Sequence, residues 1–304
     1  MSATILDGSA IASVMKEEIR RETAAFTART GIRPGLAFLL VGDNPAALSY
    51  VASKERACAH CGFSSRTVRL PATSSLSDVL EYLDAWNIDP DVHGILVQLP
   101  LPAHISEERV INAITPRKDV DGFHPVNLGK LVLGQECFRP CTPAGIQELL
   151  IRSGVEISGR HVVVVGRSNI VGKPMAIMLM QKAAGANAVV TVAHTAAQDL
   201  GSVTRLADIL IVAIGKPAAI TADMVREGAV VIDVGINRVP DPDAPKGYRI
   251  QGDVDFEPVR LKASAMTPVP GGVGPMTIVM LMRNTLQAAY RATGSNDSPA
   301  SRKG

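Results

Sequence analysis

The first 114 residues alternate short apolar runs with stretches of helical periodicity. Residues 36–41 form an uncharged apolar run, which is typical of a strand buried on both faces. Asn44 and Pro45 follow as an N-cap and a proline at the first helical position, so a helix is expected from there to about His60, with Gly62 as its stop. These signals predict a strand followed by a helix near the N-terminus.

The alternation continues and then gives way to a long irregular segment. Helical spacing predicts a helix across 76–83, an apolar run predicts a strand at 94–99, and a further helix is expected at 105–114. Residues 115–142 are rich in glycine and proline, so we expect a long loop there, of the kind that is functional or joins domains. Thr142 and Pro143 then begin another helix by the same capping argument.

The second half of the chain repeats the strand–helix pattern more clearly. The expected elements are strands at 161–165, 189–193, 209–214 and 229–234, a helix at 171–183 and a last helix at 275–292. Apolar strands that alternate with helices are typical of a parallel sheet covered by helices on its faces. The fold class is therefore α/β, and the polar tail at 293–304 is expected to be disordered.

Composition narrows the class of protein. The chain has 304 residues, enough for about two domains, and its 31 Lys and Arg against 29 Asp and Glu leave a net charge of +2. So small a charge gives no basic footprint for nucleic acid, and 46% hydrophobic with 20% charged residues is globular rather than disordered. Four cysteines do not make a disulfide scaffold.

No targeting or membrane segment is expected. The first twelve residues lack the basic and apolar regions of a signal peptide. The uncharged stretch between Lys262 and Arg283 approaches the length of a membrane span, but its prolines and glycines would leave backbone groups unsatisfied in lipid. We therefore expect a cytoplasmic protein with no membrane partner.

Residues 162–174 have the pattern of a dinucleotide-binding turn. A run of valines ends at Gly166, which allows a tight turn, and Gly172 allows close packing of the next helix, whose N-terminus would face a pyrophosphate. The middle glycine of the usual pattern is absent, with Ser168 near its place, so the turn alone also fits a structural connection. No acid ends the second strand, and Arg167 offers a cation to a 2′-phosphate, which favours NADP over NAD.

Several polar residues of the first half point to a substrate site. Tyr50 and Lys54 share one helix face, a spacing also found in short-chain dehydrogenases, but here the pair precedes the glycine turn by more than a hundred residues. That order argues against a short-chain dehydrogenase, and the spacing alone also fits an exposed helix face. Gln98 follows a buried strand, where open sheets bind ligands, and Asp121 in a charged turn would accept from amine donors of a substrate.

Five motifs follow one another along nearly the whole chain. They are Ser49-Tyr50-Val51-x-x-Lys54, Gly94-Ile95-Leu96-Val97-Gln98-Leu99-Pro100-Leu101-Pro102, Pro116-x-Lys118-Asp119-Val120-Asp121-Gly122, Gly166-Arg167-Ser168-x-Ile170-Val171-Gly172-x-Pro174 and Pro270-Gly271-Gly272-Val273-Gly274-Pro275-Met276-Thr277. In this combination the sequence closely resembles the bifunctional methylenetetrahydrofolate dehydrogenase/methenyltetrahydrofolate cyclohydrolase family, from about residue 6 to residue 292.

The resemblance implies an α/β protein of two domains that forms a homodimer. Residues 1–142 would be a folate-binding catalytic domain, completed by the helix at 276–292, which returns to it. Residues 143–275 would be a Rossmann-type parallel-sheet domain that binds NADP, with the active site in the cleft between the domains. The enzyme would oxidise 5,10-methylenetetrahydrofolate to 5,10-methenyltetrahydrofolate with NADP and hydrolyse that product to 10-formyltetrahydrofolate, in one-carbon metabolism.

The resemblance also implies roles for single residues, and no metal. Lys54 matches the family's catalytic lysine, Tyr50 its stacking tyrosine, Gln98 the glutamine that modulates the lysine, and Asp121 the pterin-binding aspartate. The folate would also contact Val97, Leu99, Pro270, Gly271, Gly272 and Val273, and the cofactor would contact Gly166, Arg167, Ser168, Thr195 and Ile236. The family usually carries a basic residue where Ala196 stands, so the preference for NADP is expected to be modest.

Other interpretations compete with this one. Cys58 and Cys61 with Cys137 and Cys141 would supply four zinc ligands, but the first pair falls inside a predicted helix, so packed free thiols are the simpler interpretation. A non-catalytic NADP-binding protein, or another two-domain dehydrogenase such as a shikimate dehydrogenase relative, would share the fold. Activity with methylenetetrahydrofolate separates these possibilities. No P-loop pattern is present, so no ATP-dependent formate–folate ligase domain is expected.

Overall fold

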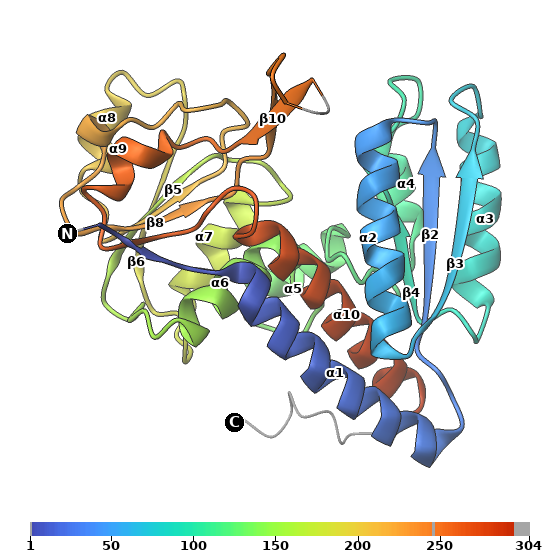
Figure 1. Ribbon diagram of the computed structural model, residues 1–304. Coiled ribbons are helices and arrows are strands. Elements are labelled where there is room, and N and C mark those ends of the chain that lie inside the picture. The colour runs from blue at the N-terminus through green and yellow to red at the C-terminus, as the bar shows by residue number, and fades with distance from the viewer. Residues whose placement is uncertain (1, 245–246, 295–304) are drawn as a thin grey trace. The chain divides into compact units, whose positions relative to one another are not determined.

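The computed structural model describes residues 2–244 and 247–294, and the chain divides into two compact units (Figure 1). The three-stranded unit comprises residues 13–141 and the chain from residue 278 on. The six-stranded unit comprises the chain up to residue 12 and residues 142–277. Two long helices, α1 (Gly8–Thr30) and α10 (Val273–Ala292), begin in the six-stranded unit and continue into the three-stranded unit.

The three-stranded unit is built on a parallel sheet with the strand order β3-β2-β4. Its elements between the two long helices are β2 (Gly35–Val41), α2 (Pro45–Cys61), β3 (Ser64–Leu70), α3 (Leu76–Ile88), β4 (Gly94–Val97), α4 (Glu107–Ala113) and α5 (Pro125–Val132). The predicted strands at 36–41 and 94–99 and the predicted helices at Pro45, 76–83 and 105–114 are confirmed.

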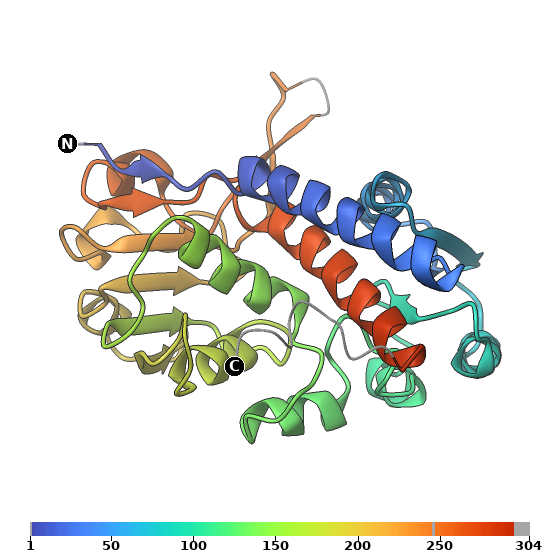
Figure 2. The same cartoon turned by 90° about the horizontal axis from the view of Figure 1, so that it is seen from below.

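Helices cover both faces of this sheet. Ala37, Leu39, Ile95 and Val97 share a core with apolar side chains of α3 and α4, whereas α2 lies on the opposite face (Figure 1). The parts of α1 and α10 that belong to this unit run side by side (Figures 1 and 2). The rings of Phe26 and Tyr290 meet edge to face with centroids 4.8 Å apart, so the last helix completes this unit.

The six-stranded unit contains a wholly parallel sheet with the order β1-β11-β8-β7-β5-β6. Its elements are β1 (Thr4–Ile5), α6 (Cys141–Arg152), β5 (His161–Val165), α7 (Gly172–Met180), β6 (Val189–Ala193), α8 (Leu200–Thr204), β7 (Ile209–Val212), a 3-10 turn (Ala222–Met224), β8 (Val230–Asp233), β9 (Asn237–Pro240), β10 (Tyr248–Gln251), α9 (Phe256–Arg260) and β11 (Ala265–Met266). Strands β9 and β10 form a separate antiparallel hairpin.

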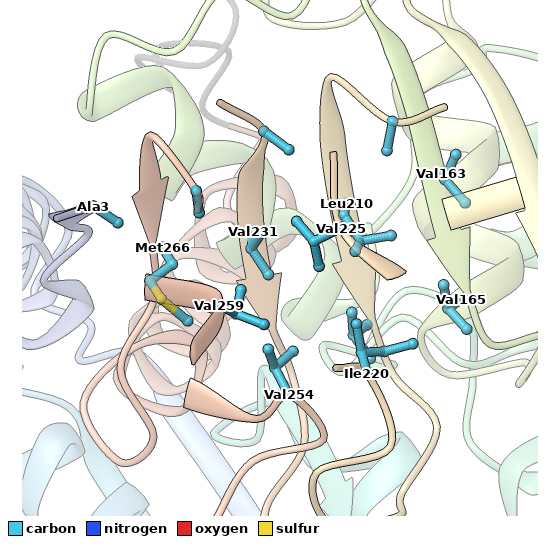
Figure 3. Close-up of a cluster of buried hydrophobic side chains, with 14 of the residues drawn as sticks. Ala3, Val163, Val165, Leu210, Ile220, Val225, Val231, Val254, Val259 and Met266 are labelled. Carbon is cyan, nitrogen blue, oxygen red and sulfur yellow. The ribbon is translucent and has the colours of Figure 1, made fainter. Parts of the chain in front are cut away.

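Burial on both faces explains the apolar sequence of these strands. One face of the sheet places Val163, Val165, Leu210, Val231 and Met266 in a common core (Figure 3). Apolar side chains of α8 and α9 pack against the same core. The prediction of an α/β fold with a parallel sheet in the second half is confirmed.

The structure differs from the expected organisation at the N-terminus. Residues 1–142 were expected to form one domain, but β1 pairs with β11, with Thr4 opposite Ala265, so the chain up to residue 12 joins the six-stranded unit. No element was predicted for residues 8–30, where the structure has the longest helix of the described residues. Its buried side chains include Met15, Ile19 and Phe26, which do recur at helical spacing.

The expectation of a long loop at 115–142 was wrong, because this segment contains α5. His124 accepts a hydrogen bond from the amide of Val126, and Pro125 occupies the first turn, which is the capping signal used elsewhere in the chain. Gly129 within the helix and Gly134 just after it obscured its pattern. The predicted disordered tail lies outside the described residues from 295 on. No helix of the described residues is long and apolar enough to cross a membrane.

Candidate active site

Helix α2 holds Lys54 in a buried position. Asn44 caps the helix by accepting a hydrogen bond from the amide of Ala46 at 2.9 Å, and Gly62 ends it in the left-handed conformation with φ of 80°. Lys54 is only 8% exposed, whereas Tyr50, one turn earlier, is considerably more exposed. The two side chains therefore share a helix face, as predicted, and differ in their contact with solvent.

Gln98 holds the amine of Lys54 in one geometry. Lys54 Nζ donates to Gln98 Oε1 at 3.0 Å, and Gln98 Nε2 donates to the carbonyl of Leu99 at 2.8 Å. Because Nε2 already has an acceptor, Oε1 must face the lysine. Gln98 follows directly after β4, whose pairing with β2 fixes the strand end. The predicted proximity of Lys54 and Gln98 is confirmed.

The environment makes Lys54 easier to deprotonate than a surface lysine. Burial lowers its pKa, and the nearby Asp121 carboxylate and Cys141 thiol oppose that shift only in part. Burial likewise raises the pKa of Asp121, while Lys54 acts in the opposite direction. The structure thus brings Lys54, Gln98 and Asp121 into one site that contains an amine suited to proton transfer.

Neighbouring residues position Asp121. The buried Asp119 accepts from the amides of Phe123 and His124, at 3.2 and 2.8 Å, and so organises the turn that follows. Asn284 of α10 donates to the carbonyl of Val120 at 2.8 Å. The backbone on both sides of Asp121 is held by these groups, which leaves its carboxylate available to a ligand apart from a hydrogen bond with Cys141.

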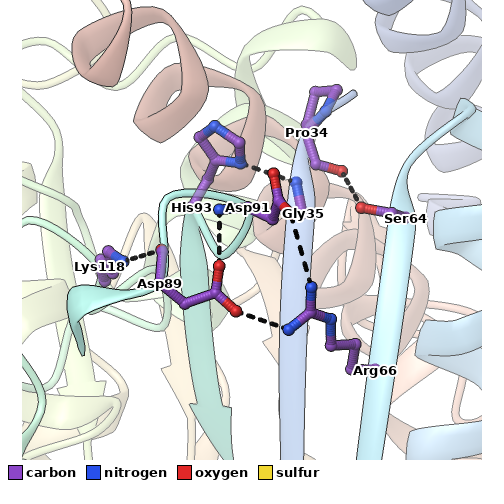
Figure 4. A network of polar contacts seen from close by, with 8 residues as sticks. All are labelled: Pro34, Gly35, Ser64, Arg66, Asp89, Asp91, His93 and Lys118. Atoms are coloured by element: carbon purple, nitrogen blue, oxygen red, sulfur yellow. Dashed lines mark hydrogen bonds and ion pairs between the residues drawn. The ribbon is translucent and has the colours of Figure 1, made fainter. Parts of the chain in front are cut away.

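Lys118 belongs to the same motif as Asp121 but has a structural role. Its Nζ donates to the carbonyls of Trp86 and Asp89, at 2.8 and 2.7 Å, at the C-terminal end of α3. Figure 4 shows it in a polar network with Asp89, Arg66 and Asp91. Carbonyl groups at a helix C-terminus attract a cation, so Lys118 anchors this helix end.

The six-stranded unit contains the predicted nucleotide-binding turn. Strand β5 lies between β6 and β7, so the order of strands reverses there, and the crevice beyond β5 is where open parallel sheets bind dinucleotides. Gly166 has φ of 134° and a side chain there would overlap the carbonyl of Ala213. A side chain at Gly172, the first residue of α7, would overlap the carbonyl of Gly166. Only glycine fits both positions, so the backbone can approach a pyrophosphate.

The predicted 2′-phosphate contacts follow two paired strands. Val165 of β5 is opposite Ala193 of β6, and Arg167 and Thr195 each come two residues later. Both are exposed, and no acid lies between Ala193 and Thr195. Arg167 forms no ion pair with the described residues. Ser168 caps the start of α7, because its Oγ accepts from the amide of Val171 at 3.1 Å. The residues present therefore fit a phosphorylated dinucleotide.

The glycine-rich loop before α10 belongs to this unit as well. Gly271 accepts from the amide of Ser9 at 2.9 Å, which ties the 270–273 loop to the start of α1. A Cβ atom at Gly274 would lie 3.9 Å from Ile236 Cδ1, so the loop is next to the predicted cofactor contact Ile236. Contacts of Pro270, Gly271, Gly272 and Val273 with a folate stay predictions, as do those of Val97 and Leu99.

Comparison with known proteins agrees with this geometry. The family model of the tetrahydrofolate dehydrogenase/cyclohydrolase catalytic domain matches residues 6–121, and that of the family's NAD(P)-binding domain matches residues 140–293. The chain belongs to the tetrahydrofolate dehydrogenase/cyclohydrolase family. The bifunctional protein FolD of Dehalococcoides mccartyi is 59% identical over 295 residues, which are 97% of this chain and 99% of that protein.

Solved structures of the tetrahydrofolate dehydrogenase/cyclohydrolase family superpose on nearly the whole chain. The bifunctional FolD methylenetetrahydrofolate dehydrogenase/cyclohydrolase of Campylobacter jejuni is 47% identical with a TM-score of 0.89, over 95% of this chain and 99% of that one. The Trypanosoma brucei FolD, solved with NADP and an inhibitor, is 40% identical with a TM-score of 0.92, over 96% of this chain and 99% of that one. The resemblance inferred from the motifs is confirmed.

Family membership removes the shikimate dehydrogenase alternative, and the structure gives no support to a zinc site. Cys58 and Cys61 are buried in α2, where Cys58 Sγ lies 3.7 Å from Met282 Sδ, and the described residues contain no metal-ligand cluster.

Sequence reasoning missed Cys141 and Asn284 as neighbours of Asp121. No local signal marks Asn284, because it reaches Val120 from 164 positions further along the chain.

Proposed function

We propose that this protein catalyses both reactions of its family on one folate. It oxidises 5,10-methylenetetrahydrofolate to the methenyl cation and then hydrolyses that cation to 10-formyltetrahydrofolate, with NADP as the oxidant. The buried Lys54–Gln98 pair next to Asp121 is the observation that carries the proposal, because hydrolysis needs a group that can move protons near neutral pH.

The hydrolysis uses the neutral amine of Lys54. Water attacks the methenyl carbon, which the two adjacent nitrogens make electrophilic, and the proton released by the water passes to Nζ. The same group can return a proton to the nitrogen that leaves when the ring opens. Gln98 Oε1 keeps the amine in place through both transfers, and the Asp121 carboxylate binds N–H donors at the pterin edge.

The oxidation depends mainly on position. NADP, when bound, accepts the hydride that leaves the methylene carbon. The protein supplies orientation and exclusion of water: the turn between Gly166 and Gly172 receives the pyrophosphate, and Tyr50 offers a flat face to the aminobenzoyl ring. Arg167 and Thr195 bind the 2′-phosphate, and with Ala196 in place of a basic residue the preference for NADP over NAD is modest.

We also propose a homodimer that forms at the edge of the larger sheet. Strand β6 is the last in the strand order and contains no charged residue, and Val189 and Val192 are 63% and 44% exposed. An edge strand of this kind presents unpaired backbone N–H and C=O groups to another strand, and here that strand belongs to a second copy of the chain. A Val192→Lys variant should sediment as a monomer, whereas a dimer of unchanged affinity would refute this interface. A cytoplasmic location stays a prediction.

The deciding experiment measures both activities in one preparation. The wild type should reduce NADP with methylenetetrahydrofolate and open methenyltetrahydrofolate, while Lys54→Met should lose ring opening and still bind NADP. Lys130→Met, an exposed lysine of the same unit, is the matched control and should retain both activities. A wild type inactive in both assays would refute the proposed function.

A further inference from the structure

Two aspartates of the six-stranded unit are buried, and neither is among the predicted folate or cofactor contacts. Asp233 ends β8 and is 3% exposed, and Asp253 follows β10 and is 0% exposed. Neither forms an ion pair with the described residues. Buried carboxylates are costly unless hydrogen bonds satisfy them, so the partners of these two acids matter.

Backbone amides take up the Asp233 carboxylate. Its Oδ1 accepts from the amides of Gly235 and Asp253, both at 2.9 Å, and its Oδ2 accepts from the amide of Val254 at 3.0 Å. Burial raises the pKa of this carboxyl to about 6, and the neighbouring Asp253 contributes to the shift in the same direction. Asp233 thus joins the segment after β8 to the segment after β10.

Asp253 connects two other segments. Its Oδ2 accepts from the amides of Ile214 and Gly215, at 2.7 and 2.8 Å, and its Oδ1 accepts from Asn237 Nδ2 at 2.8 Å. Ile214 and Gly215 follow β7, which borders β5 on the side opposite β6. Asp253 therefore fixes the backbone on the β7 side of the crevice.

The residues on either side of Ile236 are hydrogen-bonded to these two aspartates. The residue before it, Gly235, donates its amide to Asp233, and the residue after it, Asn237, donates its side chain to Asp253. A side chain at Gly235 would overlap the Asp253 carboxylate, so the backbone before Ile236 packs directly against this acid. Ile236 itself is 48% exposed and so remains available for contact with a ligand.

We propose that Asp233 and Asp253 are positioning residues that hold Ile236 and the 214–215 backbone for the nicotinamide half of the cofactor. The inference rests on the proposed function. Arg167 and Thr195 place the 2′-phosphate on the β6 side of the crevice, so a dinucleotide across the Gly166 turn extends its other half towards β7 and β8. Both acids act through the backbone amides that they bind rather than through direct contact with the cofactor.

The test compares Asp233→Asn and Asp253→Asn with Asp243→Asn, an exposed aspartate of the same unit. The amide keeps the size of the carboxylate but cannot accept on both sides, so each buried variant loses at least one hydrogen bond to a charged group. We expect the Kd for NADPH, from direct fluorescence titration, and the KM for NADP to rise about tenfold or more. The kcat of ring opening, which needs no NADP, should be unchanged, as should all constants of Asp243→Asn.

Three results would overturn the proposal. The first is an unchanged Kd for NADPH in both Asp233→Asn and Asp253→Asn. The second is an equal loss of NADPH binding and of ring opening, because that would indicate a general structural role for the two acids. If neither variant folds, Asn237→Ala decides, because it removes one donor to Asp253 together with a longer hydrogen bond to the carbonyl of Gln251. Wild-type NADPH affinity in that variant is the third result. The proposed function fails separately, through a wild type that lacks both activities.

Discussion

Substituting Gln98 by Glu tests whether Lys54 works as a neutral amine. The change is isosteric and puts a negative charge where Oε1 accepts from Nζ, at 3.0 Å. At an effective dielectric constant of about 20, a charge pair at this 3.0 Å distance is worth about 5 kcal/mol, or about four pKa units. Burying the new carboxylate opposes part of this gain, so we expect the pKa of Lys54 to rise by less than this full amount.

A higher pKa removes the neutral amine at neutral pH. Once the pKa exceeds the pH, each further unit lowers the fraction of neutral amine tenfold, so the rate of ring opening should fall at neutral pH and recover as the pH is raised. The assay follows loss of the methenyl chromophore across the neutral and alkaline range. Gln135→Glu, which makes the same charge change at an exposed position of the same unit, should keep the wild-type profile.

The reasoning would be refuted by a Gln98→Glu enzyme that opens the ring at the wild-type rate with an unshifted pH profile. In that case Lys54 would act in its charged form, and burial would serve some other purpose. A rate that falls equally at every pH would also contradict the prediction, because it would point to lost geometry around Gln98 rather than to a changed pKa of Lys54.

Four further substitutions test other parts of the structure. Lys54→Met should slow ring opening at least about a hundredfold, and a thermal shift with NADP equal to the wild type's checks that the cofactor still binds. Asp121→Ala should raise the KM for the folate about ten- to a hundredfold, and an equal loss of NADP affinity would instead indicate a folding defect. Arg167→Ala should bring kcat/KM for NADP and NAD close to parity, and an unchanged ratio would contradict its assignment. Lys118→Met should lower the free energy of unfolding by about 1–3 kcal/mol in urea titrations, without changing the KM for the folate or the KM for NADP.

Much of the local structure follows from the sequence. The apolar runs at 36–41 and 161–165 predicted strands that the structure contains, because a strand covered on both faces needs apolar residues at every position. Asn44 and Gly62 marked the two ends of α2, because each capping residue forms its hydrogen bonds with backbone groups only a few residues away from it. The same local logic placed Lys54 one turn after Tyr50 and Gln98 at a strand end.

Some local signals were present but outweighed by others. Helix α5 begins with a capping histidine and a proline, yet its glycines favoured a loop, and tertiary packing decided the outcome by burying Asn127 and Leu131. Helix α1 has buried residues at regular helical spacing, Asp7 caps its start by accepting from the amide of Ala10 at 3.0 Å, and Gly31 follows its last residue in the left-handed conformation, yet these signals were not combined into a predicted helix. In both cases the free energy of the helix comes mainly from packing, which propensity alone does not measure.

Only the tertiary structure decided which groups satisfy the buried charges. The sequence grouped Lys118 with Asp121, but Lys118 turns to the end of α3 and only Asp121 joins Lys54. Asn284 reaches the backbone beside Asp121 across 164 positions. Composition and spacing determined which chemical groups this protein has and which elements bear them. Folding determined their partners, because a buried charge takes whichever donor or acceptor the packed chain brings within hydrogen-bonding distance.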